Sequence, residues 1–192
     1  MTRAGRFRIL GAGLAATAAV VFIAACGSSS GSAGTGNTPD YSKSLAGAPR
    51  PLAALYAQAD QLLPGGTEAF QRRLAQLRGH PVVVNQWASW CGPCREEMPW
   101  YQRLSAKLGK RIAFLGVDSQ DSDAAAKDFL EEFPLPYPSY TDPGKDIAKA
   151  MNATIGLPDT AIYDSSGKQV HVQQGQYSSE AALEADIKRY AQ

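Results

Sequence analysis

Apolar residues recur along the chain with two different periods. Residues 81–87 (PVVVNQW) and 111–118 (RIAFLGVD) are short β-branched runs, which are typical of strands buried on both faces of a sheet. Each run is followed by a longer segment in which apolar residues recur every three or four positions, as on one face of a helix. Strands that alternate with helices in this way predict an α/β domain, built on a sheet with helices on both faces.

The same two periods divide the rest of this domain, residues 80–192. Helices are predicted from Cys91 to about Leu108 and over 122–133, 143–151 and 178–192; a short strand is predicted at 138–142; and 160–164 with 169–175 form a strand–turn–strand hairpin. The hairpin would add antiparallel strands to parallel ones, so the sheet is expected to be mixed.

Two further helices are predicted ahead of the first strand, and we assign residues 51–79 to a helical N-terminal extension. Residues 51–63 (PLAALYAQADQLL) have apolar side chains at helical spacing and are followed by Pro-Gly-Gly. The next helix has Thr67 as a suitable N-cap and Gly79 as its stop. Residues 26–50 are rich in Gly, Ser, Thr and Pro after Cys26 and predict a flexible linker.

Residues 1–25 predict an export signal. Three arginines and no acidic residue precede an apolar run that continues without charge up to Cys26. The run ends in Ile-Ala-Ala-Cys, which resembles the lipobox of bacterial lipoproteins, so Cys26 is expected to become the lipidated first residue of the mature chain. The alternative is an uncleaved transmembrane anchor, for which the run is barely long enough. Both interpretations place the domain outside the cytoplasm.

The charge of the chain argues against nucleic acid as a partner. The 192 residues include 19 Lys and Arg and 18 Asp and Glu. Without residues 1–25, which hold three of the arginines, 16 basic and 18 acidic side chains remain, and the net charge becomes −2. No block of Lys or Arg occurs, so the sequence lacks the basic surface that nucleic-acid binding requires.

With Cys26 assigned to lipid, the domain has two cysteines, Cys91 and Cys94, in the sequence WCGPCREE. A disulfide between residues three apart closes a very short loop, so a structural staple would stabilise little. A structural zinc needs four ligands, and His80 and His171 are scattered and expected to face solvent. Haem attachment requires a histidine directly after the second cysteine. A redox pair is the favoured interpretation, and copper binding is an alternative.

The position of the pair is suited to thiol chemistry. The predicted strand ends at Trp87 and a helix begins at Cys91, so unpaired N–H groups and the helix dipole favour a thiolate there. Gly92 and Pro93 separate the cysteines, and proline is tolerated in the first helical turn. Cys91 is therefore predicted to be the nucleophile, and Cys94, one turn further on, the thiol that resolves a mixed disulfide.

The segment NQWASWCGPCREEMP resembles the active site of the thioredoxin superfamily, and more closely that of the TlpA/ResA-type membrane-tethered thiol–disulfide oxidoreductases. The resemblance extends from about Pro81 to the C-terminus. It implies a thioredoxin fold, and the additional strand and helix predicted between the cysteine helix and residue 158 match the strand–helix insertion of this group. Residues 51–79 match less well, because the group commonly begins with a β-hairpin.

The resemblance also implies roles for single residues. Pro158, in IGLPDTAIYD, corresponds to a cis-proline that faces the cysteines, and the backbone of Leu157 would pair with an extended substrate segment. Glu97 corresponds to a glutamate proposed to move protons to or from the cysteines; the alternative is a solvated helix carboxylate. Pro99 would kink the helix by removing a hydrogen bond to Arg95.

Two positions close to the cysteines have two interpretations each. Asn85 stands where cytoplasmic thioredoxins have a buried aspartate, and an amide cannot take up a proton. A proton relay must then use Glu97 or water, and Asn85 is otherwise expected to bond backbone groups beneath the helix. Trp90, beside Cys91, is expected either to line the substrate groove or to serve as a packing residue.

Together these features predict a lipid-anchored, extracytoplasmic thiol–disulfide oxidoreductase that acts as a monomer and needs neither a metal nor an organic cofactor. Its substrates would be protein thiols or disulfides, with cytochrome c maturation as one setting, and a membrane electron donor or acceptor would regenerate the pair. The resemblance favours a protein disulfide reductase. A thiol oxidase for exported proteins and a copper(I)-binding chaperone are the alternatives.

Overall fold

The computed structural model describes residues 39–192, so the predicted export signal and Cys26 lie outside the described residues. The strands are β1 (Leu62–Leu63), β2 (Val82–Trp87), β3 (Ala113–Ser119), β4 (Ser139–Asp142), β5 (Asp159–Tyr163) and β6 (Gln169–Gln174). The helices are α1 (Tyr41–Ser44), α2 (Arg50–Tyr56), α3 (Gly66–Gln76), α4 (Gly92–Leu108), α5 (Asp123–Glu132), α6 (Asp146–Ala150) and α7 (Glu180–Tyr190). Within this part of the chain, no helix has the length and apolar character to span a membrane.

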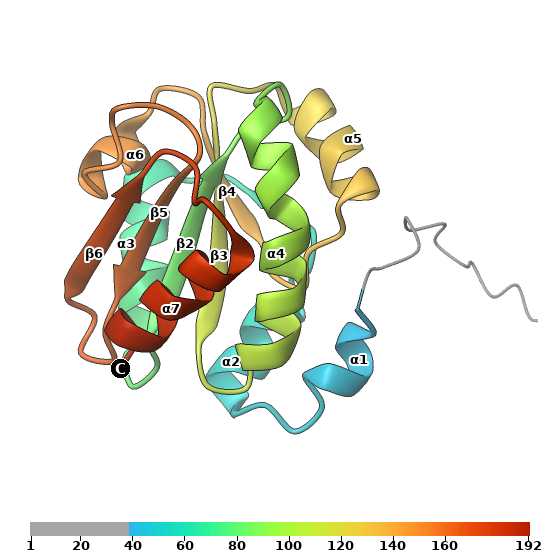
Figure 1. The fold of residues 1–192 in the computed structure, drawn as a ribbon, viewed down its shortest axis with the longest axis vertical. Helices are drawn as coiled ribbons and strands as arrows, with labels where there is room; N and C mark the ends of the chain where they lie inside the picture. The colour runs from blue at the N-terminus through green and yellow to red at the C-terminus, as the bar shows by residue number, and fades with distance from the viewer. Residues whose placement is uncertain (1–38) are drawn as a thin grey trace, which may run out of the picture. The chain divides into compact units, whose positions relative to one another are not determined.

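These strands form one mixed sheet in the order β1-β4-β3-β2-β5-β6 (Figure 1). The first four pair in parallel, and β5 and β6 are antiparallel to their neighbours. The predicted hairpin is therefore confirmed as β5–β6. The short strand predicted at 138–142 is β4, and the sequence between α4 and β5 contains two strands and two helices, as predicted.

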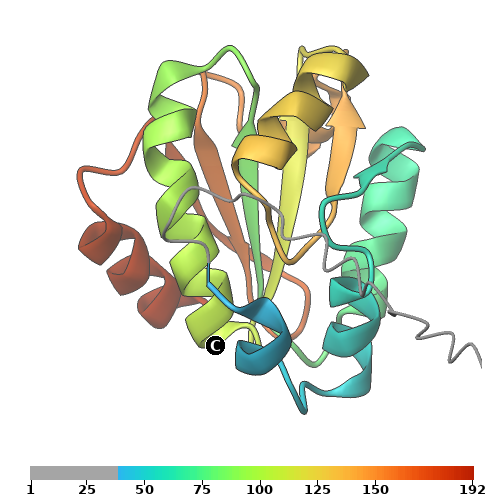
Figure 2. The same cartoon turned by 90° about the vertical axis from the view of Figure 1, so that its right-hand side faces the viewer.

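Helices cover both faces of the sheet, which confirms the predicted fold class. Helices α4, α5 and α7 pack on one face against a cluster that includes Val83, Trp87 and Phe114, and α2, α3 and α6 pack on the other against Val82 and Val84. Figure 2 separates these layers, with α4 and α7 on one side of the strands and α2 and α3 on the other. Successive residues of β2 thus point into two different cores, which explains why all of its residues are buried and why three valines follow one another without a polar residue between them.

The helix predicted over residues 51–63 is wrong in its second half. It ends at Tyr56, and Leu62–Leu63 form β1, which pairs with β4 at the edge of the sheet. Asp60 turns the chain with a left-handed backbone (φ 57°), and its Oδ1 accepts a hydrogen bond from Leu135 N at 2.5 Å. Pairing with an open sheet edge has overridden the helical spacing of the leucines.

Two nearby boundaries also differ from the prediction. Helix α3 begins at Gly66, with Gly65 as its N-cap in place of Thr67. The last part of the predicted flexible linker contains α1, and the Tyr41 hydroxyl donates a hydrogen bond to Pro134 O at 2.9 Å. An aromatic residue with a partner for its hydroxyl has therefore ordered a stretch whose composition predicts flexibility.

His171 does not face solvent as expected. It lies in β6, where its ring stacks on that of Tyr190 with centroids 4.2 Å apart. Its Nε2 is 3.1 Å from Asp186 Oδ2, although the two atoms are not aligned as a hydrogen bond. Helix α7 covers this part of the edge strand, and the position of His171 in a hairpin strand did not indicate this contact.

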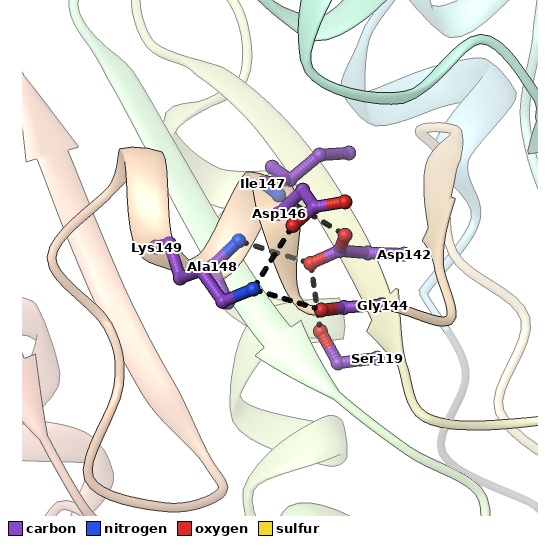
Figure 3. A network of polar contacts seen from close by, with 7 residues as sticks. All are labelled: Ser119, Asp142, Gly144, Asp146, Ile147, Ala148 and Lys149. Atoms are coloured by element: carbon purple, nitrogen blue, oxygen red, sulfur yellow. Dashed lines mark hydrogen bonds and ion pairs between the residues drawn. The ribbon is translucent and has the colours of Figure 1, made fainter.

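A buried aspartate joins α6 to the sheet (Figure 3). Asp142, the last residue of β4, accepts hydrogen bonds from Ile147 N at 3.0 Å and Ala148 N at 2.9 Å. The Ser119 hydroxyl donates to Asp142 Oδ2 at 3.3 Å and accepts from Gln86 Nε2 at 3.1 Å. Asp142 therefore satisfies two backbone groups at the start of α6 and connects that helix to strands β2, β3 and β4.

Asp142→Ala is expected to lower the free energy of unfolding by about 2 kcal/mol or more, because it leaves two buried N–H groups without a partner. Guanidinium unfolding at neutral pH measures the loss. Asp146→Ala is the matched control: Asp146 lies four residues away and forms an exposed ion pair with Lys149 at 3.0 Å, a kind of contact that contributes little. Equal losses in the two variants would contradict the role of Asp142.

Candidate active site

Cys91 and Cys94 form a disulfide at the start of α4. Cys91 is the N-cap of this helix, and its Sγ accepts a hydrogen bond from Cys94 N at 3.2 Å. Gly92 and Pro93 occupy the first two helical positions, as predicted. Both cysteines are buried, with Cys91 4% and Cys94 2% exposed. Once the pair is reduced, the same N–H group and the helix dipole would stabilise a thiolate at Cys91.

The pairing of β5 with β2 brings Pro158 to the end of the sheet at which β2 leads into the cysteine pair. Gln86, near the end of β2, pairs with Asp159, the first residue of β5, and the chain reaches Cys91 shortly after β2 ends. The Leu157–Pro158 peptide bond is cis, as predicted. Leu157 is half-buried and packs against the apolar cluster that contains both cysteines.

Two large apolar side chains are exposed on the segments next to this end of the sheet. Trp90, directly before Cys91, is 61% exposed, and Ile155, three residues before Pro158, is 80% exposed. The indole Nε1 of Trp90 donates a hydrogen bond to Gln120 O at 3.0 Å. This exposure argues against the packing interpretation of Trp90, since a ring that packs in a core is covered by its neighbours.

Glu97 lies inside the protein, so the interpretation as a solvated carboxylate is wrong. It is 1% exposed, and its Oε1 accepts a hydrogen bond from Tyr177 N at 2.5 Å. Within residues 39–192, its Oε2 has no hydrogen-bond partner. Burial raises the pKa of Glu97 to about 7; the Tyr177 N–H opposes this shift and the nearby Asp159 carboxylate adds to it. The neighbouring Glu96, in contrast, is exposed.

Asp159 is a second buried carboxylate that the sequence prediction missed. It follows Pro158 directly, is 1% exposed, and accepts a hydrogen bond on Oδ1 from Gly175 N at 2.8 Å. Burial raises its pKa, against the effect of Gly175 N–H and of Lys145. The predicted strand began one residue later, at Thr160, which left Asp159 in a loop. An acidic residue between a cis-proline and a buried strand was the signal available.

Asn85 lies in β2, before the cysteines in the sequence, and Pro99 lies after them in α4. Asn85 is buried, but its Nδ2 donates to Met98 Sδ at 3.9 Å, and the expected hydrogen bonds to backbone groups are not found among the described residues. Asn85 therefore contacts α4 through the Met98 side chain and not through backbone hydrogen bonds. Pro99 lies within α4, as predicted.

This arrangement can support thiol–disulfide exchange. A sulfur pair at a helix N-terminus supplies the nucleophile and the resolving thiol, and a carboxyl group with a pKa of about 7 lies one turn after Cys94. Exposed apolar side chains on the two flanking loops offer a surface for a protein substrate. Among residues 39–192, no group of three or more His, Cys, Asp or Glu is placed to hold a metal ion.

The names of the relatives that match this chain indicate the same type of chemistry. The chain is 31% identical over 117 residues to thiol-disulfide oxidoreductase ResA of Bacillus thuringiensis subsp. konkukian, a match that covers 60% of this chain and 66% of the relative. It is 39% identical over 112 residues to the thiol:disulfide interchange protein DsbE homolog of Paracoccus denitrificans, covering 57% and 58%. The chain thus spans less than two thirds of the length of each of these relatives.

Solved structures and a family model complete the comparison. A putative thiol:disulfide interchange protein DsbE from Chlorobium tepidum matches with a TM-score of 0.55 and 28% identity, over 60% of this chain and 83% of that one. A putative protein disulfide isomerase from Bacteroides thetaiotaomicron matches with a TM-score of 0.53 and 30% identity, over 61% and 77%. The predicted thioredoxin-like fold is thereby confirmed. Since the Redoxin family model matches residues 58–187, most of the sequence, the chain belongs to the Redoxin family.

Proposed function

We propose that this chain is a membrane-anchored, extracytoplasmic thiol–disulfide oxidoreductase that reduces protein disulfides with the pair Cys91–Cys94. The observation that carries the proposal is the position of the Cys91 sulfur at the N-cap of α4, where it accepts the N–H of Cys94. This position favours the thiolate form that exchange requires. The names of the ResA and DsbE relatives support the same chemistry.

In the reducing direction, the Cys91 thiolate attacks one sulfur of a substrate disulfide, and the other substrate sulfur leaves as a thiolate. The Cys94 thiolate then attacks Cys91 Sγ, which releases the second substrate sulfur and forms the Cys91–Cys94 disulfide. The substrate gains two electrons and two protons. A membrane electron donor must return two electrons to the pair before the next cycle; an oxidase would instead pass them to an acceptor.

Glu97 is the group that we assign to proton movement in this cycle. It lies one helical turn after Cys94, and a carboxyl with a pKa of about 7 exchanges protons readily near neutral pH. Trp90 and the backbone of Leu157 are assigned to docking, since the family resemblance implies that an extended substrate segment pairs with the backbone directly before the cis-proline.

The direction of electron flow is tested by equilibrating the purified chain with glutathione redox buffers and counting alkylated thiols. A potential well below that of glutathione supports the reductase, and one well above it supports a thiol oxidase. Cys91→Ser is the control and should show no redox transition. Tight binding of one copper(I) without measurable disulfide exchange would contradict both and indicate a copper chaperone. An oxidised Cys-X-X-Cys-His peptide, compared with an unrelated peptide disulfide, tests the cytochrome c setting.

The membrane anchor is tested by fractionation of cells that produce the chain. We expect the chain in the membrane fraction, with a diacylglyceryl group on Cys26 detectable by mass spectrometry. Cys26→Ala should lack that mass. If the wild-type protein instead retains residues 1–25 ahead of an unmodified Cys26, the transmembrane interpretation replaces the lipid anchor. The predicted apolar run is compatible with either arrangement.

A further inference from the structure

The turn between β2 and α4, residues 88–91, is held by the loop that follows β3, residues 120–122. Ser89 N donates a hydrogen bond to Asp121 Oδ2 at 2.6 Å, and Trp90 Nε1 donates to Gln120 O at 3.0 Å. Because Trp90 is 61% exposed, its ring has little packing to fix it. These two hydrogen bonds therefore contribute much of what orients the indole next to Cys91.

Asp121 bridges two structural elements with its two carboxylate oxygens. Oδ2 accepts from Ser89 N, and Oδ1 accepts from Ser122 N at 2.8 Å. Ser122 is in turn the N-cap of α5, since its Oγ accepts from Ala125 N at 3.3 Å. The turn before the reactive cysteine is thus connected through one side chain to the start of α5.

Asp118 is a neighbour of Asp121 and is the more deeply buried of these two aspartates. It occupies β3 opposite Trp87 of β2 and Thr141 of β4, and it is 2% exposed. Its side chain faces that of Asp121, and its Oδ1 has no hydrogen-bond partner in the part of the chain that the structure describes.

A contact between two carboxyl groups requires a proton on one of them. The charged groups that face Asp118 are Asp121 in the loop after β3, Asp123 on α5 and Asp142 on β4, and all of them are acidic. Burial, followed by these neighbours, raises the pKa of Asp118 to about 8. At neutral pH Asp118 is therefore protonated and can donate its proton to Asp121.

We propose that Asp121, held by its hydrogen bond with Asp118, is a positioning residue that fixes the turn before Cys91 and the orientation of Trp90. When Asp118 loses its proton, two anionic side chains face each other in a buried site, and the repulsion displaces Asp121 from Ser89 N. The turn then loosens at alkaline pH. The effect on the turn stands independently of catalysis, whereas any effect on substrate docking rests on the role proposed above for Trp90.

The test is an NMR titration of the full-length chain in detergent, with 15N-labelled indole groups and an intact disulfide, so that no active-site thiol titrates. Trp90→Phe identifies the Trp90 resonance. We expect this resonance to shift between pH 7 and 9 with a midpoint about 8, the pKa of Asp118. Asp118→Asn should abolish the shift and keep the neutral-pH position, because an amide donates to Asp121 at every pH.

Asp121→Ala should place the Trp90 resonance away from its wild-type position at every pH. Asp128→Asn, on the exposed face of α5, is the control and should titrate like the wild type. Glu97→Gln should also keep the transition near pH 8, which would show that the transition does not report the titration of Glu97. A transition that persists in Asp118→Asn, or a wild-type resonance in Asp121→Ala, overturns the proposal. If Asp121→Ala does not fold, the wild-type and Asp118→Asn titrations still decide.

Kinetics separate the turn from the docking role. At pH 7, Asp121→Ala is expected to raise KM for a protein disulfide about tenfold, equivalent to ~1.4 kcal/mol, with kcat nearly unchanged. Asp118→Asn should keep the wild-type KM and hold it constant to pH 9. A shifted indole resonance with an unchanged KM would support the positioning of the turn and overturn the docking role of Trp90.

Discussion

Cys94→Ser is expected to convert the chain into a trap for its substrates. Cys91 can still attack a substrate disulfide, but the thiol that resolves the mixed disulfide is gone. Turnover should fall by about a thousandfold or more, because an external thiol must replace one that is held on the same helix turn. Non-reducing electrophoresis and mass spectrometry of the adduct measure the trapped complex, which should form with one substrate molecule per chain.

Cys91→Ser is the matched control for this experiment. The same disulfide substrate should give no adduct with it, because Cys94 lies within the first turn of α4, whereas Cys91 is the N-cap, where the helix N-terminus stabilises a thiolate. Both variants are best made with Cys26→Ala, so that a third thiol cannot form adducts. Adducts through Cys94 in the Cys91→Ser variant would reverse the assignment of nucleophile and resolving thiol.

The main part of the fold could be predicted because its signals are local. The β-branched run at residues 81–87 and the amphipathic segments after it have periods set by strand and helix geometry, and each became the predicted element. The failure lies at residues 51–63, where β1 exists only through its pairing with Ser139–Tyr140. A two-residue strand has no period of its own, so its presence depends on a partner about 77 positions away along the chain.

The active site divides in the same way. The cysteines follow from a short motif and the position of Glu97 on α4 from helix spacing, whereas the cis bond at Pro158 was implied by the family resemblance. The burial of Glu97 depends on Tyr177, which lies 80 residues further along the chain. Asp159 was missed for a related reason: its carboxylate is significant only because β5 carries it close to Glu97. Contacts of this range require the folded chain.

Glu97→Gln is expected to stabilise the oxidised protein above neutral pH. An ordinary glutamate has a pKa of about 4.5, whereas burial raises the pKa of Glu97 to about 7 in the folded chain. Between these values the folded state holds a proton that the unfolded state has lost, so the free energy of unfolding falls as pH rises. The loss amounts to about 3 kcal/mol by pH 7 and levels off by about pH 8.

Guanidinium unfolding of the wild type and Glu97→Gln at pH 5 and pH 8 measures this difference. Glutamine can still accept the hydrogen bond of Tyr177 N but carries no charge. The residue at position 97 should therefore not lower the stability of Glu97→Gln between pH 5 and pH 8. Comparing the two proteins removes the contributions of other titrating groups, apart from Asp159, whose carboxylate also becomes easier to ionise once Glu97 is neutral. That effect acts in the same direction.

Glu96→Gln is the control, because Glu96 neighbours Glu97 on α4 and is exposed. It should follow the wild-type stability at both pH values, and equal pH dependence in Glu97→Gln and the wild type would show that the buried carboxyl is not protonated near neutrality. The stability and activity measurements constrain each other. If Glu97 exchanges protons with the cysteines, the pH at which the stability loss levels off, which is set by the folded-state pKa of about 7, must reappear as a pKa in the kcat/KM profile and vanish in Glu97→Gln. A levelling-off in stability without a kinetic counterpart would leave Glu97 a buried acid outside the reaction.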